Sequence, residues 1–572
     1  MPYIQGVDRN QLMMCSLEGF VAPQSLARII DAFTSGLDLE ELGFARAKAA
    51  YEGRPAYDTR SLLNLYLYGS RKGIRSSRKL SDACSVNVEI MWLMNWVQPD
   101  FRTISDFRKD NIDCLKKVFK AFNRKLATVL TQGFKSIDGS KFQASNSKDN
   151  NFTANKLDDR IAWLNQHSEE YLRQLDELDR LDEDADIPGR FTKQELEAKL
   201  LETLERLERY EGYRSYMEEN GLSQLSLTDP DAKLMKSKNG FMVAYNIQTV
   251  VDSKTHLIDD FQTTNQVTDH GLIHSSVDPV KKEGDEDILE VTADKGYLDE
   301  SDMINCLENG IIPHVVLPDG QDFYELEVAY KPNECNEDTI NSTASDDLKK
   351  CMHAGVVPKA YEDVIEGVEI IERRQLVRNE PEEDRPPYGT VEEMMAQAKD
   401  GYFIRDPERN VVYCPAGATL RQKSIKKSGD IRYANKFACK NCKFSKNCIS
   451  GNADWKEVDF SKDALKKPNR NWQKVMGIID VDEPKVKKQK GRFEKVKIVK
   501  MKFRPDRNKT SERMCISEHP FGTIKRTMNA EYFLLRKKRK VDGEVALMCF
   551  GYNLIVALNL LGFEKMMNAM AA

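Results

Sequence analysis

The sequence predicts an α/β protein whose core is a mixed sheet flanked by helices, preceded by an all-α region and interrupted by insertions. Helical apolar spacing dominates residues 1–130, and strand-like segments alternate with helix-like segments between 134 and 318. Two stretches of different composition, 153–224 and 321–509, divide that alternating pattern. The length of 572 residues also favours several domains over one.

Residues 1–130 are expected to form a helical domain that binds DNA. Apolar residues recur at helical spacing at Ile112, Leu115, Val118, Phe119 and Phe122. The basic tract at 71–80, RKGIRSSRKL, offers Arg75 and Arg78 for contacts with DNA phosphates. A solvated helix end would explain this tract equally well.

The alternating region predicts the core sheet. The segment FKSIDGSKFQAS suits a short strand that ends in a turn at Gly139, and residues 240–264 suit a hairpin that turns at Asp252-Ser253. A helix near 269–276 precedes the buried strand ILEVTADKGY, and a helix at 299–309 precedes the strand IIPHVVLP. The expected order is strand, insertion, two strands, helix, strand, helix, strand.

The first insertion, 153–224, is expected to be an antiparallel helical hairpin. Apolar residues follow a 4-3 spacing on both sides of a break at Pro188-Gly189. Its role is interpreted as structural, or as a platform for dimer or DNA contacts.

The second insertion, 321–509, reads as irregular, with acidic loops, a Cys cluster at 411–450 and a basic segment at 464–509. The basic segment holds 16 Lys or Arg against 5 Asp or Glu, although the whole chain has a net charge of −5. Such segregation can create a local face that attracts DNA. A solvated charged surface is the alternative.

The remaining apolar stretch, 546–563, is near the minimum length of a membrane span. It contains Asn553 and Asn559 and follows a basic segment, so a core helix is the preferred interpretation and no membrane partner is expected. The amino-terminal residues show no apolar signal segment, which favours a reducing cytoplasmic location, associated with the nucleoid.

Three acidic residues are candidates for a metal-dependent phosphodiester chemistry. Asp138 and Asp294 each follow an apolar strand and stand before or near a glycine, and Glu518 begins a helix-prone segment, with Glu512 as its nearest rival. Mg²⁺ prefers hard oxygen ligands, and carboxylates far apart in sequence can meet at strand ends. An Asp at a strand end is more often a turn former than a ligand, so position alone does not decide.

The sequence motifs around these acids resemble those of a known family. IDGSK at 137–141, ADKGY at 293–297 and EHPFGTIKR at 518–526 look like the active-site blocks of bacterial insertion-sequence transposases with an RNase H-like, DDE catalytic core. DFRK at 106–109 looks like part of the helical domain ahead of that core.

The resemblance implies a core built from 131–152, 225–320 and 510–568, with Asp138, Asp294 and Glu518 as ligands of Mg²⁺ or Mn²⁺. It implies an oligomer, a dimer on paired ends, that binds double-stranded DNA at the element's inverted-repeat ends and joins them to target DNA.

Part of this superfamily carries a YREK motif, and Lys525 stands seven residues after Glu518, as its Lys does. The Lys of that motif is expected to contact a phosphate of the transposon end, so the resemblance implies the same contact for Lys525. Ser511 stands at the Tyr position and Met514 at the Arg position, with Arg513 one place early. The further candidates for DNA contacts are Arg513, Arg526, Lys141 and Lys295. His519 suits either a place near the metals or a hydrogen-bonded role at a helix end.

Four cysteines, Cys414, Cys439, Cys442 and Cys448, suit a structural zinc ion. The CKNC pair lets two sulfurs face one centre, and the two single cysteines would complete four thiolates. Reduced thiols, or a site degraded from a metal-binding one, are the alternatives.

The leading prediction is therefore a transposase. An RNase H-like nuclease that cuts without joining, and a transposase-derived DNA-binding protein that no longer cuts, remain alternatives. The presence of all three acids counts against the second of these.

Overall fold

The structure is a computed structural model in which two compact units are distinguished. The first comprises Met1–Asn151, Ser226–Arg373 and Lys495–Ala572, and the second comprises Phe152–Leu225 and Arg374–Glu494. The structure describes residues 10, 14–48, 55–146, 148–180, 191–237, 240–332, 335–377, 391–407, 409–426, 430–440, 442–449, 453–461, 464–475 and 492–571. Residues 476–491 of the predicted basic segment lie outside these ranges.

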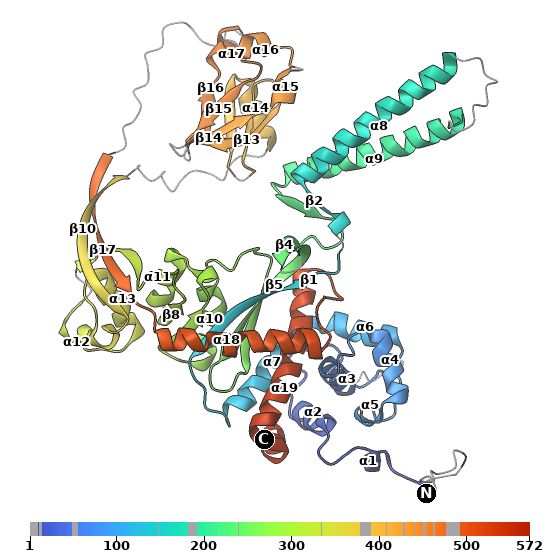
Figure 1. The fold of residues 1–572 in the computed structure, drawn as a ribbon, viewed down its shortest axis with the longest axis vertical. Coiled ribbons are helices and arrows are strands. Elements are labelled where there is room, and N and C mark those ends of the chain that lie inside the picture. Colours follow the sequence, from blue (N-terminus) through green and yellow to red (C-terminus); the bar gives the residue numbers. More distant parts are fainter. Residues whose placement is uncertain are drawn as a thin grey trace. The chain divides into compact units, whose positions relative to one another are not determined.

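A mixed sheet forms the centre of the first unit (Figure 1). Its strands are β1 (Lys135–Gln143), β4 (Lys233–Ser237), β5 (Gly240–Asp252), β6 (Ile258–Thr264), β7 (Leu289–Ala293) and β8 (Ile311–Val315). The order is β4-β5-β1-β7-β8, and β6 also pairs with β5. β5 runs antiparallel to β1 and β6, whereas β7 runs parallel to β1 and β8. The predicted strands and helices occur in the predicted order, with β4 as an additional strand that the prediction lacked.

The expected turn at Gly139 is wrong, because β1 continues unbroken to Gln143. Gly139 pairs with Gln248 in the middle of the β1–β5 ladder. A Cβ at residue 139 would lie 2.4 Å from Gln248 Nε2. The glycine is therefore required by a close side chain on the neighbouring strand and not by a turn.

Helices cover both faces of the sheet. On one side, α10 (Ile273–Gly284) and α11 (Glu300–Glu308) share a hydrophobic core with Ile137, Val250 and Val291. On the other side, the amino-terminal helices and α19 (Lys538–Ala571) share a core with Phe142 and Tyr245. The amino-terminal helices are α1 (Leu17–Phe20), α2 (Leu26–Ser35), α3 (Thr59–Arg71), α4 (Ser77–Val86), α5 (Val88–Leu93), α6 (Phe101–Asp110) and α7 (Ile112–Ala127). Residues 1–130 are helical as expected, but they share one compact unit with the sheet.

α19 is long and apolar enough to cross a membrane by length and composition alone. In this structure 61% of its most apolar window is buried, and its Asn553 accepts a hydrogen bond from the Ile258 amide of β6. This packing agrees with the interpretation as a core helix.

A second, three-stranded sheet with order β10-β17-β9 belongs to the first unit. It consists of β9 (Tyr324–Ala329), β10 (Ile365–Val377) and β17 (Arg492–Phe503), with α12 (Glu337–Ile340) and α13 (Ser345–Ala354) beside it. β17 leads into α18 (Arg507–Gly522), which contacts β1, β5, β7 and β8 as it crosses the central sheet (Figure 1).

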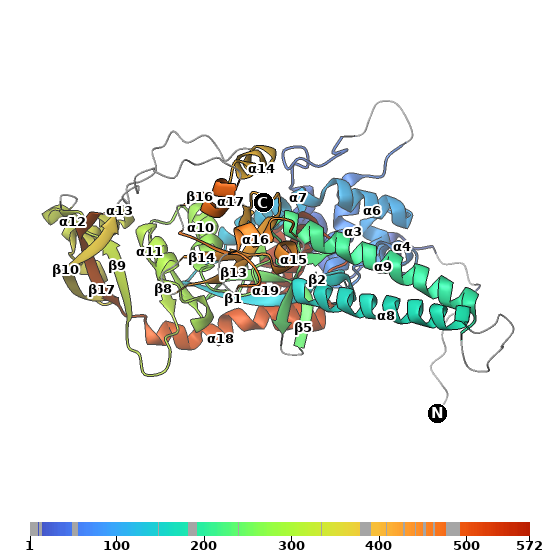
Figure 2. The same ribbon diagram turned by 90° about the horizontal axis from the view of Figure 1, so that it is seen from above.

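The second unit contains the predicted helical hairpin. α8 (Ala154–Arg180) and α9 (Lys193–Glu219) run side by side (Figure 2), with β2 (Asn151–Thr153) and β3 (Gln224–Ser226) paired at their base. Thr192 and Glu195 form a capping box at the start of α9.

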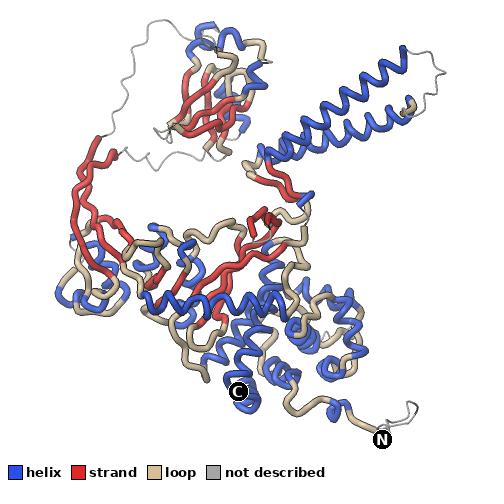
Figure 3. The backbone as a smooth tube through the Cα atoms, in the orientation of Figure 1, coloured by secondary structure: helices blue, strands red, loops and turns tan. Residues whose placement is uncertain are grey.

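The same unit contains a six-stranded antiparallel sheet, shown in red in Figure 3. Its elements are α14 (Val391–Lys399), β11 (Tyr402–Asp406), β12 (Val411–Tyr413), β13 (Thr419–Ile425), β14 (Ile431–Ala434), α15 (Lys436–Lys440), α16 (Ser445–Cys448), β15 (Glu457–Phe460), β16 (Lys466–Pro468) and α17 (Arg470–Val475). The expectation of an irregular 321–509 segment is therefore wrong. The strands of the six-stranded sheet have only three to seven residues and lie between turns and charged residues, which hid their alternation.

Replacing Lys135 with Met is expected to destabilise the first unit by about 3–5 kcal/mol. The Lys135 ammonium is fully buried and lies 3.1 Å from Asp252 and 2.8 Å from Asp259. The variant leaves two carboxylates in the core without their cation. Urea unfolding would measure the loss, with the exposed neighbour Lys254→Met as the control. Equal stability of the two variants would contradict a structural role for this ion triad.

Candidate active site

The central sheet brings two of the predicted acids to adjacent strands. Asp138 lies within β1, and Asp294 follows the last residue of β7. The parallel register pairs Lys135 with Val291 and Ser136 with Thr292. Continued by two residues, this register sets Asp138 beside Asp294, on strands spaced about 4.8 Å apart.

Glu518 comes from α18, which crosses the same strands. It is exposed, and its charge acts on the Asp138 carboxyl. Its rival Glu512 is also exposed on this helix. The effect of Glu518 on Asp138 makes it the candidate for the third acid. We call Asp138, Asp294 and Glu518 the acid site.

The acid site carries an excess of negative charge. Burial raises the pKa of Asp138 to about 7, while the Gly139 amide and Arg513 lower it and Glu518 and Asp269 raise it. The Gly139 amide donates to Asp138 Oδ1 over 2.9 Å. A cation bound here would favour the ionised form of Asp138.

Arg513 faces the acid site, and Met514 does not. Arg513 is 7% exposed, its Nη2 lies 4.0 Å from Asp294 Oδ1, and its charge also acts on Asp138. Met514 is 60% exposed. The early position of this Arg in the sequence motif therefore still places a guanidinium beside two of the acids.

Lys525 joins the end of α18 to the strand that carries Asp138. It lies in a π-helical turn, Thr523–Thr527, and its ammonium donates to Ser140 Oγ over 2.7 Å and to the Lys141 carbonyl over 2.9 Å. Its Nζ also lies 4.4 Å from the centre of the Phe142 ring. A cation is therefore held two to four residues beyond Asp138 on the same strand.

The other predicted cations divide into exposed and structural ones. Arg78, Lys295 and Arg526 are exposed, and Lys141 is partly buried. Arg75 differs from the expectation, because its side chain is only 12% exposed and pairs with buried Glu544 at 3.2 Å. Its guanidinium also donates to the carbonyls of Asn529 and Tyr532. Arg75 fastens the amino-terminal helices to the carboxy-terminal segment.

His519 lies in the last turn of α18 and is 3.2 Å from the Tyr552 hydroxyl of α19. This contact agrees with the hydrogen-bonded alternative.

Asp269, which the sequence interpretation did not single out, lies beside Gly139 of β1, and its charge acts on Asp138. Its Oδ1 accepts hydrogen bonds from Asn246 and Gln248 of β5, over 2.7 and 2.8 Å. The only local sequence signal for Asp269 was its position between a strand and a helix, two residues before Gly271. Acidic residues are common at such positions in loops, so the signal did not distinguish it.

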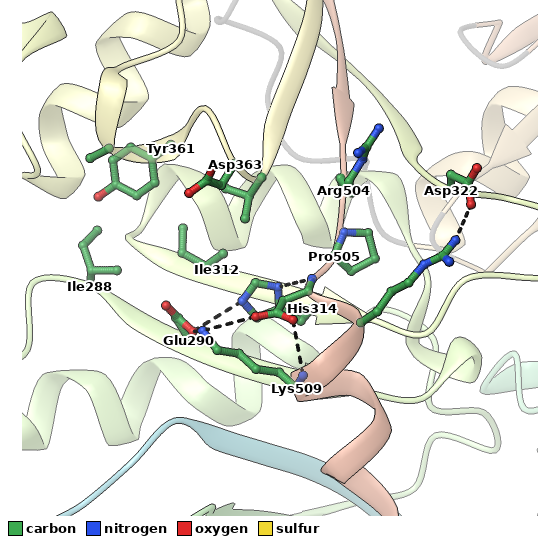
Figure 4. Close-up of a pocket in the computed structure, with 14 residues that line it drawn as sticks. Ile288, Glu290, Ile312, His314, Asp322, Tyr361, Asp363, Arg504, Pro505 and Lys509 are labelled. Atoms are coloured by element: carbon green, nitrogen blue, oxygen red, sulfur yellow. Dashed lines mark hydrogen bonds and ion pairs between the residues drawn. The ribbon is translucent and has the colours of Figure 1, made fainter.

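A cavity of about 700 Å³ lies at the amino end of α18, away from the acid site (Figure 4). His314 of β8 is buried, accepts from the Asp506 amide over 3.1 Å, and has its Nε2 3.5 Å from Glu290. Glu290 of β7 also pairs with Lys509 of α18. These contacts tie the start of α18 to two strands of the central sheet.

Replacing Glu290 with Gln is expected to flatten the acid dependence of stability. The contacts with His314 and Lys509 lower the pKa of Glu290 to about 2, below its ordinary value of 4.5. The folded state therefore gains stability above about pH 4.5 and loses it as the pH falls toward 2. Because Glu290 is 39% exposed, water limits the contribution to about 1 kcal/mol. Thermal midpoints from pH 2 to 6 would test this, and parallel curves for both proteins would contradict it.

The four predicted zinc ligands gather at one end of the six-stranded sheet. Cys414, Cys439, Cys442 and Cys448 all line one cavity of about 30 Å³. The Ala418 amide donates to Cys414 Sγ over 3.3 Å, and the Asn469 side chain donates to Cys448 Sγ over 3.1 Å. Burial and the neighbouring thiols raise the pKa of Cys414.

Within the described ranges, no three His, Cys, Asp or Glu side chains already stand at the spacing of a bound metal ion. Both groups nevertheless offer suitable donors. The acid site presents carboxylate oxygens with excess negative charge, and the cysteine cavity presents sulfurs that accept hydrogen bonds.

Comparison with known proteins gives two family matches. Residues 16–110 match the family described as "Transposase domain (DUF772)", and residues 413–558 match the family described as "Transposase DDE domain". No curated protein matches the chain.

Among solved structures, the chain is similar to a piggyBac transposase synaptic complex with hairpin DNA, at 9% identity, over 97% of this chain and 77% of that chain, with a TM-score of 0.25. A TM-score this low carries no argument about fold or function.

Proposed function

We propose that the chain is an insertion-sequence DDE transposase, which binds the ends of its element and catalyses metal-dependent cleavage and joining of DNA strands; the matches to two transposase domain families support this. The observation that carries this proposal is the acid site, in which acids 156 and 224 residues apart along the chain are gathered by two parallel strands and one crossing helix. In the sheet β4-β5-β1-β7-β8, with β6 also beside β5, the antiparallel strands β6, β5 and β1 are followed by β7 and β8 parallel to β1, and this arrangement supports an RNase H-like core.

Asp138, Asp294 and Glu518 would hold Mg²⁺ or Mn²⁺, whose carboxylate preference they fit. When bound, such ions supply an activated attacking hydroxyl and stabilise the leaving oxygen. The positive charge of Arg513 offsets the negative charges of Asp138 and Asp294. Its ion pair with Asp294 would also hold α18 against the end of β7. Lys525 keeps a positive charge next to the strand of Asp138, where a scissile phosphate would be received.

Cations near these elements would bind the DNA backbone. Exposed Arg526 and Lys295 and partly buried Lys141 lie close in sequence to the acid site, and exposed Arg78 lies in the amino-terminal helices. We propose contacts with both transposon ends and target DNA, in a dimer assembled on paired ends and associated with the nucleoid of the cytoplasm.

The cysteine cavity is proposed as a structural zinc site with Cys414, Cys439, Cys442 and Cys448 as ligands. Its place beside the six-stranded sheet supports a stabilising role and no part in catalysis.

The full-length protein should be incubated with Mg²⁺, DNA carrying the element's ends and a target plasmid. Cleaved ends joined to the plasmid are expected. Cleavage without joining would favour a nuclease, and binding without any metal-dependent product would favour a DNA-binding descendant that no longer cuts.

A further inference from the structure

A hydrogen-bond chain passes over β1 and connects the turn that follows Asp294 to β5, the strand on the other side of β1. It lies beside Gly139, on the face of β1 opposite the Asp138 side chain. The Tyr297 hydroxyl donates to Gln248 Oε1, and Gln248 Nε2 donates to Asp269 Oδ1 over 2.8 Å. Tyr297 is three residues after Asp294, in the short helical turn Lys295–Tyr297 that Asp294 caps. Gln248 stands opposite Gly139, the residue after Asp138.

The direction of this chain is determined by its carboxylate end. An ionised carboxylate only accepts, so the amide of Gln248 must present its NH₂ group to Asp269 and its oxygen to Tyr297. Burial and the nearby Asp269 raise the pKa of Tyr297 well above its ordinary value, so the phenol keeps the proton that it donates. Each link therefore has one orientation available.

Close packing leaves the chain little room to shift. Gln248 is fully buried and Tyr297 is 1% exposed. A Cβ at Gly139 would lie 2.4 Å from Gln248 Nε2 and 2.6 Å from Asp269 Oδ1, so the bare backbone of β1 fits beneath them. Asn246 donates a second hydrogen bond to the same Asp269 oxygen.

We propose that Gln248, Tyr297 and Asp269 are positioning residues that hold the Asp294 turn against the strand of Asp138, so that both carboxylates address the same cation. The inference rests on the proposed function for its catalytic consequence, but its effect on cation binding can be measured without DNA. Partners that orient metal ligands typically change metal affinity or activity by about 10- to 100-fold when removed.

Tyr297→Phe removes only one hydroxyl group, the first donor of the hydrogen-bond chain. Its matched control is Tyr245→Phe on β5, which removes a buried hydroxyl that donates to Asp229 over 2.8 Å. The two variants should lose similar stability. Only Tyr297→Phe should weaken Mn²⁺ binding about 10-fold, slow cleavage of end DNA about 10-fold or more, and raise the Mg²⁺ concentration needed for half-maximal cleavage.

Mn²⁺ binding to the DNA-free protein, followed by electron paramagnetic resonance, separates the possible results. Equal Mn²⁺ affinity in the Tyr297→Phe and Tyr245→Phe proteins would overturn the positioning role. If Tyr297→Phe binds Mn²⁺ more weakly than Tyr245→Phe does, but the wild-type protein cleaves no DNA, the positioning role would be supported and the proposed function overturned. Absence of Mn²⁺ binding in the wild type would overturn both.

Discussion

Asp138→Asn is expected to lower the rate of DNA end cleavage by at least about 10³-fold while leaving DNA binding intact. The amide keeps the shape of the side chain and can still accept from the Gly139 amide, 2.9 Å away in the wild type. It removes the charge that a divalent cation would need at the centre of the acid site. Loss of one negative charge near the phosphates should, if anything, strengthen DNA binding slightly.

Single-turnover cleavage and an electrophoretic binding assay would measure the two effects. Asp278→Asn on α10 is a suitable control, because Asp278 pairs with Lys282 on the same helix. Cleavage at the control rate by Asp138→Asn would remove Asp138 from the acid site. Loss of both cleavage and binding would point to misfolding, which circular dichroism of the variant would reveal.

Cys439→Ser is expected to unfold the six-stranded sheet of the second unit and to abolish zinc binding. Structural zinc sites typically contribute about 10–16 kcal/mol of apparent binding free energy, more than a domain of this size can lose. The four cysteines line one small cavity, and Cys414 and Cys448 pack against the hydrophobic core of this sheet, so a bound ion would tie the segments that carry them to that core.

Zinc content by native mass spectrometry, with hydrogen exchange of residues 402–475, would test this prediction. Cys515→Ser, at an exposed cysteine of α18, should keep one zinc ion per chain. A wild-type protein without zinc whose sheet is protected from exchange would show that the cysteines are reduced thiols in a metal-free fold.

Much of the central sheet and its helices could be predicted from local sequence. The strands around 134–145, 240–264, 288–297 and 311–318 and the helical hairpin follow apolar patterns that depend only on neighbouring residues. Asp138 and Asp294 could be chosen because each accompanies such a strand. Their proximity then follows from the parallel pairing of β1 with β7.

Long-range partners account for the predictions that differ from the structure. Arg75 was expected to contact DNA, but its partner Glu544 lies 469 residues away along the chain and is itself buried. Gly139 was expected in a turn, but Gln248 on another strand requires its missing side chain. No local pattern contains either partner.

The sequence by itself determined which acids accompany apolar strands and which four cysteines lie close together along the chain, although Asp138 lies within β1 and not at its end. Only the tertiary structure decided that Arg513, and not Met514, turns toward the acids, and that the charge of Glu518 acts on Asp138. It also decided that Asp269 bonds to Gln248 of β5 and acts on Asp138. The physical reason is that the rotation of α18 and the partner of each polar side chain are selected by packing against the central sheet, which combines residues hundreds of positions apart.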